Sequence, residues 1–322
     1  MKLEPQFLLR PLPEKPGGAV AHAIHAALPP GAPDPTLGFL KELPGTWTGK
    51  GFNVIWRPNN TPGQDRFLEL NLTTEVLEFS ESIGDIPNRG FLQPDIIMHG
   101  ITYMQKIADA NLKGGLHVEP GIWATVPATT NPTEPATVVR MATIPHGTSI
   151  LAQGLAREDA GAPVISDNDI VPFIIGNPGN RIQFPEPDLA TPTQFRTPPE
   201  GLVGITQKMV TNPNSFLQDA IVGQNITKTT TLHVSTDPTP PVSIGGGSAN
   251  TAFLEGTPVT GPKTGPNAIA ITASSTFWIE TIADPAGGPD TLQLQYTQLV
   301  LLNFNGLSWP HVSVATLQKQ KG

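Results

Sequence analysis

Short segments in which apolar and polar residues alternate recur along most of this chain, and they limit its fold more than any other feature. Between Gly45 and Leu317 we count about ten such segments, separated by turns that contain proline or glycine. Alternation with a period of two is typical of a β-strand with one buried face. About ten strands are enough to close into a barrel with an interior. We therefore predict an all-β fold, a closed antiparallel β-barrel of about ten strands.

The first predicted strand is introduced by the stretch Gly45-Thr46-Trp47-Thr48-Gly49-Lys50-Gly51-Phe52-Asn53. Its glycines allow a tight turn and a close approach of neighbouring chains. Trp47 offers a large apolar surface with one N–H group and could plug a barrel end. The predicted strands cover residues 51–56, 67–79, 97–107, 115–126, 137–144, 149–153, 226–235, 268–282, 291–304 and 311–318.

The remaining segments suggest additions to a single domain that spans residues 36–322. Residues 1–35 are predicted to form an extended, proline-rich arm with a short helix, and a second short helix is expected over 36–43. Residues 155–225 break the strand pattern with many prolines and one helix, near 216–222. A long ordered insert of this kind is usually a lid, a binding loop or a subunit contact. Residues 237–267, with glycines at 245–247, are predicted to form a flexible loop.

Composition excludes several classes of function. The net charge is −8 and no basic run is present, so nucleic acid is not an expected partner. The chain has no cysteine, which excludes disulfides, thiol catalysis and cysteine metal sites. We find neither an apolar signal core near Met1 nor an apolar run of membrane-spanning length, so we expect a cytoplasmic protein without a membrane partner.

Five motifs, taken in order, resemble the nitrobindin family of small haem-binding barrels with a fatty-acid-binding-protein-like fold. Gly45 to Gly51 is similar to the family's G-x-W-x-G-x-G. The other four are Leu116-His117-Val118-Glu119-Pro120-Gly121-Ile122-Trp123, Ile144-Pro145-His146-Gly147-Thr148 with Gly154, Thr291-Leu292-Gln293-Leu294-Gln295-Tyr296, and His311-Val312-Ser313-Val314-Ala315-Thr316-Leu317. The resemblance covers about half of the chain, and residues 1–35 and 155–225 have no counterpart in it.

This resemblance implies a haem b cofactor, with His311 as the axial ligand of the iron. A single proximal histidine leaves one face of the iron open to a small molecule. Nitric oxide, peroxynitrite or peroxide would react there, so an enzyme of this kind would be peroxynitrite isomerase-like or peroxidase-like. On the residues alone, His311 could equally be a turn residue beside Trp309 and Pro310 with its ring in solvent.

His117 and Glu119 lie two apart on a predicted strand, so their side chains face the same side. Such a pair can orient a ring, bind a metal or shuttle protons, or it can be a buried hydrogen-bonded pair that satisfies both groups. Trp47, His99 and Met98 are further candidates for the lining of a cofactor pocket. Tryptophan and methionine also serve as packing residues, and His99 precedes a possible bulge at Gly100.

Three hypotheses of function follow from these observations. The first is the haem barrel with His311 as ligand. The second is an iron-free binding barrel that carries a fatty acid, a terpenoid or another apolar small molecule. The third is an interaction protein whose barrel is filled and whose insert and N-terminal arm build an oligomer. A homo-oligomer is expected under the first hypothesis as well.

Overall fold

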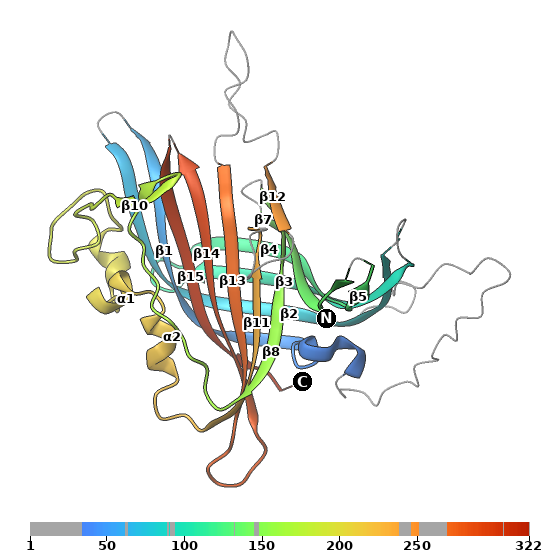
Figure 1. Ribbon diagram of the computed structural model, residues 1–322. Helices are drawn as coiled ribbons and strands as arrows, with labels where there is room; N and C mark the ends of the chain where they lie inside the picture. Colours follow the sequence, from blue (N-terminus) through green and yellow to red (C-terminus); the bar gives the residue numbers. More distant parts are fainter. Residues whose placement is uncertain are drawn as a thin grey trace, which may run out of the picture.

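Ten long strands form a closed antiparallel barrel in the computed structural model (Figure 1), which confirms the predicted fold class. The structure describes residues 34–61, 64–88, 90, 94–131, 133–144, 148–237, 246–250, 269–304 and 306–321. The order around the barrel is β1-β2-β3-β4-β7-β8-β11-β13-β14-β15, and β15 pairs with β1 to close it. Each strand therefore has a partner on both sides, and the barrel wall has no free edge.

The barrel strands are β1 (Gly45–Thr61), β2 (Gln64–Asn88), β3 (Ile96–Asp109), β4 (Gly115–Val126), β7 (Thr137–Ile144), β8 (Thr148–Ala160), β11 (Ile226–Ser235), β13 (Ile269–Ile282), β14 (Thr291–Phe304) and β15 (Leu307–Lys319). The smaller elements are the 3₁₀-helices η2 (Pro35–Leu40) and η3 (Pro199–Leu202), the helices α1 (Gln207–Thr211) and α2 (Ser215–Ala220), and the short strands β5 (Thr129–Thr130), β6 (Thr133–Glu134), β9 (Phe173–Ile174), β10 (Asn177–Arg181) and β12 (Gly246–Asn250).

One end of the barrel is closed by η2, and we call it the closed end. Asp34 caps this helix by accepting a hydrogen bond from the backbone N–H of Thr36 at 2.9 Å. Leu37 and Leu40 are fully buried and pack on the core. Trp47 at the start of β1 donates from Nε1 to the carbonyl oxygen of Leu43 at 2.8 Å, which ties the helical segment to the first strand.

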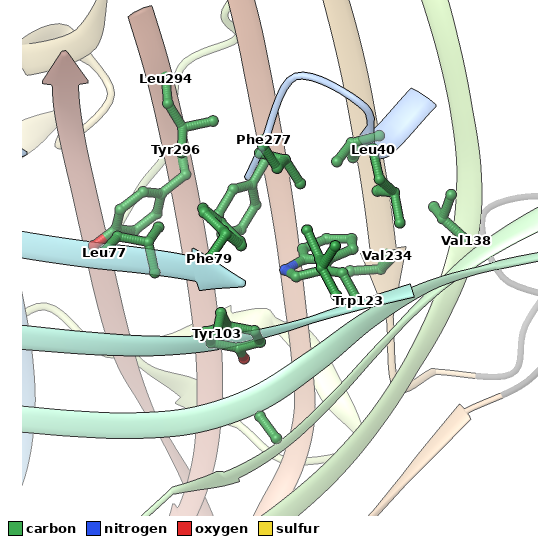
Figure 2. Close-up of a cluster of buried hydrophobic side chains, with 14 of the residues drawn as sticks. Leu40, Leu77, Phe79, Tyr103, Trp123, Val138, Val234, Phe277, Leu294 and Tyr296 are labelled. Carbon is green, nitrogen blue, oxygen red and sulfur yellow. The ribbon is translucent and has the colours of Figure 1, made fainter. Parts of the chain in front are cut away.

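A large apolar core fills the half of the barrel next to η2. Figure 2 shows Phe79, Trp123, Phe277 and Leu40 gathered among these side chains. Phe277 stacks on Tyr296 with their ring centroids 5.1 Å apart and meets Trp123 edge-on at 5.2 Å. Aromatic pairs of this geometry add stability beyond their buried area. The core therefore leaves only the opposite half of the barrel available for a cavity.

The insert lies along the outer wall of the barrel. Its apolar residues Ile170, Val210 and Leu217 pack in one buried cluster with Phe52 and Trp56 on the outer face of β1. Trp56 donates from Nε1 to the carbonyl oxygen of Ile170 at 2.9 Å. Burial of this surface gives the insert a hydrophobic attachment to its own barrel. The sequence analysis predicted a lid, a binding loop or a subunit contact for this segment, and it did not predict packing against the outer wall of the same barrel.

Several predicted boundaries were wrong. β8 continues to Ala160, seven residues beyond the predicted end at Gln153, because it pairs with β11 along this length. Residues 246–250 of the predicted loop form β12 on the first half of β8. The predicted helix over 36–43 is a 3₁₀-helix that ends at Leu40, with Gly38 at a φ of 53° inside it. Residues 1–33 of the predicted arm lie outside the described residues.

Gly121 in β4 is a position where a side chain does not fit. An added Cβ would overlap the ring of Tyr103 and would lie 2.5 Å from the carbonyl oxygen of Met141. We expect Gly121→Ala to lower the free energy of unfolding by about 1–3 kcal/mol, the usual cost of overpacking. Urea denaturation measures this, with Gly115→Ala on the same strand as the control, since no atom lies within 4 Å of its added Cβ. Equal stabilities of the two variants would contradict the assigned packing.

Candidate functional site

A cavity occupies the half of the barrel opposite η2, which we call the open end. Its volume is about 150 Å³, within a hollow of about 980 Å³ that includes solvent at its mouth. The wall is mainly aliphatic, from Ile55, Ile107, Leu116, Ile144, Ile150, Ala270, Val300 and Leu302. The polar lining consists of Asn53, Gln105, His117, Thr148, Tyr296, Gln298, His311 and Ser313. An apolar wall with a few polar groups is typical of cavities that hold small molecules.

A buried ion pair lies between the apolar core and the cavity. The side chains of Arg140 on β7 and Glu119 on β4 are only 1 % and 0 % exposed. Nη2 of Arg140 donates to Oε1 of Glu119 at 2.5 Å. The hydroxyl of Tyr103 donates to the same oxygen and accepts from Arg140 Nε at 2.9 Å. His117, which lines the cavity, places Nε2 3.3 Å from Glu119 Oε2. The predicted pairing of His117 with Glu119 on one face of the strand is therefore confirmed.

The opposite charges of Glu119 and Arg140 determine the protonation states of both side chains. Burial would raise the pKa of Glu119, but the charge of Arg140 and hydrogen bonds from His117 and Tyr103 outweigh it and lower the pKa to about 2. Burial opposes the charge of Arg140, yet the carboxylate of Glu119 raises the pKa of the guanidinium above its ordinary value. Burial also raises the pKa of Tyr103. Glu119 and Arg140 therefore remain an ion pair at neutral pH.

A second buried carboxylate, Glu75 on β2, is surrounded mainly by uncharged hydrogen-bond donors. It accepts hydrogen bonds from the hydroxyl of Tyr296 at 2.6 Å, from Thr73 at 2.9 Å and from Nε2 of Gln105 at 3.3 Å. Burial raises the pKa of Glu75 to about 7, and these hydrogen bonds together with the charge of His117 offset only part of that effect. Gly51 on β1 makes room for the group, because an added Cβ there would lie 2.6 Å from Glu75 Oε1.

The two histidines of the predicted site, His311 and His117, line the same cavity from β15 and β4. His311 is partly buried, and its Nε2 lies 2.8 Å from the carbonyl oxygen of Trp56 on the neighbouring strand β1. One ring nitrogen of each histidine is thus held by an oxygen acceptor, and this arrangement commonly orients imidazoles that bind metals. The described residues contain no group of three or more His, Cys, Asp or Glu side chains arranged around a metal position.

Three predicted cofactor-binding residues do not line this cavity. Trp47 belongs to the core at the closed end. Met98 packs with Ala124 and Val139 in a separate small cluster. His99 lies near the start of β3, with Nε2 3.1 Å from Asp85 Oδ1. None of the three therefore lines this cavity: the apolar core separates Trp47 from it, and Met98 lies on the opposite face of the sheet from the interior residues Tyr103 and Trp123.

Sequence reasoning missed several polar residues of the interior, including Asn53, Gln105, Arg140, Gln298 and Ser313. Strand alternation was the available signal, since Asn53 precedes Ile55 by two and Ser313 follows His311 by two. Alternation shows which residues share one face of a strand. It does not show whether a polar face is exposed to solvent or lines a cavity.

The fold and the site define a closed β-barrel with a ligand-sized cavity at one end. No protein-family profile and no curated protein sequence matches this chain. Among solved structures, the chain is similar to the crystal structure of Rv2717c from M. tuberculosis, with a TM-score of 0.40 and 13 % sequence identity over 90 % of this chain and 99 % of that chain. In the described residues, no helix has the length and apolar character needed to cross a membrane.

Proposed function

We propose that this protein binds a small, mainly apolar molecule in the cavity at the open end of the barrel. The observation that carries the proposal is the cavity itself, with aliphatic walls and a set of polar side chains among them. The buried ion pair and the aromatic core beneath it make a rigid floor, so a ligand would enter a preformed space. Preformed cavities lose little free energy to ordering when a ligand binds.

Titration with N-phenyl-1-naphthylamine, an uncharged fluorescent probe, tests this proposal. The matched variants are Val300→Trp, which fills the cavity from β14, and Leu151→Trp, which adds the same ring to an exposed position on β8. We expect saturable binding to the unmodified protein, a loss of affinity of about tenfold or more in Val300→Trp, and no change in Leu151→Trp. No saturable binding, or equal loss in both variants, would remove the proposal. Independently of the titration, native mass spectrometry of the purified protein would identify any co-purified molecule.

Haem b is a specific candidate ligand because two imidazoles, His311 and His117, line one cavity. The apolar walls suit a porphyrin, and the nitrobindin-like motifs imply His311 as the axial ligand. Bound haem would supply an iron face for nitric oxide, peroxynitrite or peroxide. In this chain, the carbonyl oxygen of Trp56 would hold the ring of His311, and Glu119 would orient His117 beside the same space.

Haemin titration followed by absorption separates this candidate from an iron-free ligand. We expect a Soret band that saturates at micromolar haemin and that His311→Ala abolishes or shifts. His233→Ala is the control, because His233 lies on β11 with Nδ1 2.8 Å from Thr276 Oγ1 and does not line the cavity. A flat titration would exclude haem, and an unchanged band in His311→Ala would exclude His311 as the ligand.

Assembly into a homo-oligomer remains a prediction. The insert expected to build it covers the outer wall of its own barrel, yet Val164, Val203 and Val222 in this segment are exposed. Light scattering coupled to size-exclusion chromatography measures the mass directly, and a monomer would exclude the oligomer.

A further inference from the structure

The buried cation below the cavity, Arg140, uses four of its five N–H donors within the protein. Nε donates to Tyr103, Nη2 donates to Glu119, and Nη1 donates to Ser275 at 2.7 Å and to Oε1 of Gln298 at 2.5 Å. An arginine in this state is neutralised by its carboxylate and has little capacity left for a second anion. A ligand carboxylate in the cavity would therefore find no unpaired buried cation in the described part of the interior.

Gln298 has a fixed orientation because of Arg140. Its Oε1 accepts from Arg140 and also from the hydroxyl of Ser275 at 3.2 Å. Turning the amide over would place its NH₂ group against a guanidinium that can only donate, so the observed orientation is strongly favoured. Since Gln298 lines the cavity and its oxygen faces the arginine, its Nε2 is left to donate toward the cavity.

Asn53 supplies the complementary group on β1. It is only 3 % exposed, and it lines the same cavity. Its Oδ1 is buried without a hydrogen-bond partner and its Nδ2 donates no hydrogen bond, so nothing prevents the amide from turning to present Oδ1 to a ligand. A buried polar atom without a partner costs about 1–3 kcal/mol, so a group that fills the cavity and donates to it would be favoured.

The strand register places these groups in one row across the inner wall. Gln298 on β14 is the register partner of Ser313 on β15, and Ser313 is the partner of Asn53 on β1. Neighbouring strands are about 4.8 Å apart, so the three side chains form a continuous uncharged polar strip. All three line the cavity. Charged or titratable groups on the strands around this strip include the Glu119–Arg140 pair, the Arg57–Glu69 pair, Glu75, Asp109 and the two histidines.

We infer that the cavity selects uncharged apolar molecules that carry a hydroxyl group, such as a long-chain or terpenoid alcohol, over the corresponding carboxylate. The hydroxyl oxygen accepts from Nε2 of Gln298 and the hydroxyl hydrogen is donated to Oδ1 of Asn53. A carboxylate cannot donate to Asn53, and it would enter a region where Glu75 and Asp109 contribute negative charge while the charge of Arg140 is already neutralised by Glu119. This inference rests on the proposed function and names the ligand class of the same cavity.

Displacement of bound N-phenyl-1-naphthylamine from the full chain tests the inference with three matched probes: decan-1-ol, decanoate and the methyl ether of nonan-1-ol. At about pH 8 a carboxylic acid is ionised and an ordinary imidazole is neutral. We expect the alcohol to bind about tenfold or more tightly than decanoate, and about three- to tenfold more tightly than the ether, which accepts a hydrogen bond but cannot donate one.

Asn53→Ala should remove the preference for the alcohol over the ether while the ether keeps its affinity. Asn177→Ala, at an exposed position on β10, is the matched control and should leave all three affinities unchanged. Decanoate binding as tightly as decanol, or an ether that equals the alcohol on the unmodified protein, would overturn the inference, and neither comparison depends on a variant. If the fluorescent probe binds but no alcohol displaces it, the inference fails and the proposed function stands. If the probe does not bind, both fail.

Discussion

Arg140→Leu is expected to lower the free energy of unfolding by about 3–5 kcal/mol, the usual cost of removing one partner from a buried ion pair. The change leaves the carboxylate of Glu119 buried without its cation, and it removes the donors to Ser275 and Gln298. Several elements meet at this residue, since β4, β13 and β14 all supply acceptors to it. Urea denaturation at neutral pH measures the loss.

Two further variants separate the ion pair from general loss of packing. Arg140→Leu combined with Glu119→Gln should recover part of the lost stability, because the uncompensated charge is gone. Arg157→Leu is the surface control. Its ion pair with Asp159 has side chains that are 73 % and 55 % exposed, so its loss should be within about 1 kcal/mol. A double variant that is no more stable than Arg140→Leu alone would contradict the assigned role of Glu119.

The ion pair also predicts acid sensitivity. Glu119 has a pKa of about 2 in the folded protein against an ordinary value of 4.5, so the folded state binds its proton less readily than the unfolded state. The stability it contributes is present above pH 4.5 and is lost as the pH falls from there toward 2. Glu119→Gln removes this titration, and its stability should fall less steeply across that window than that of the unmodified protein. Equal slopes in the two proteins would contradict the lowered pKa.

Much of the fold could be predicted because the strands have one buried face. The segments 115–126, 137–144, 226–235 and 291–304 were predicted with the same bounds as β4, β7, β11 and β14. The predictions failed where tertiary pairing decides the structure. The second half of β8 has few apolar residues and is a strand because β11 runs beside it, and β12 is a glycine-containing segment held by β8.

The site was predictable only in part, for a related reason. His311, His117 and Glu119 were found from motifs, and the structure places both histidines at one cavity. Arg140 and Gln298 lie 158 residues apart, and their contact arises from closure of the barrel, which brings β7 and β14 to face each other across the interior. No local pattern signals such a pair. From the sequence alone, a single arginine in a predicted strand is interpreted as a surface residue, because its partners on distant strands are not known.

Glu75→Gln is expected to make the protein more stable at alkaline pH by about 1–3 kcal/mol. Burial raises the pKa of Glu75 from 4.5 to about 7, so the folded state holds a proton that the unfolded chain releases. The stabilising effect of that proton is complete below pH 4.5 and is lost as the pH rises through about 7. Above that pH the folded protein must hold a buried charge that its neighbours stabilise only in part, whereas glutamine carries none.

Urea denaturation of both proteins at about pH 5 and about pH 8 measures this effect, since the two values lie near the ends of the titration. Glu78→Gln on the same strand is the matched control, because its side chain is 36 % exposed and pairs with Lys106 at the surface. Glu280 also has a pKa raised to about 7 by burial, so Glu75→Gln should remove only part of the loss of stability between the two pH values. The same pH dependence in Glu75→Gln and the unmodified protein would mean that Glu75 is ionised throughout. In that case, the hydrogen bonds from Tyr296, Thr73 and Gln105, with the charge of His117, would have to stabilise the buried carboxylate fully.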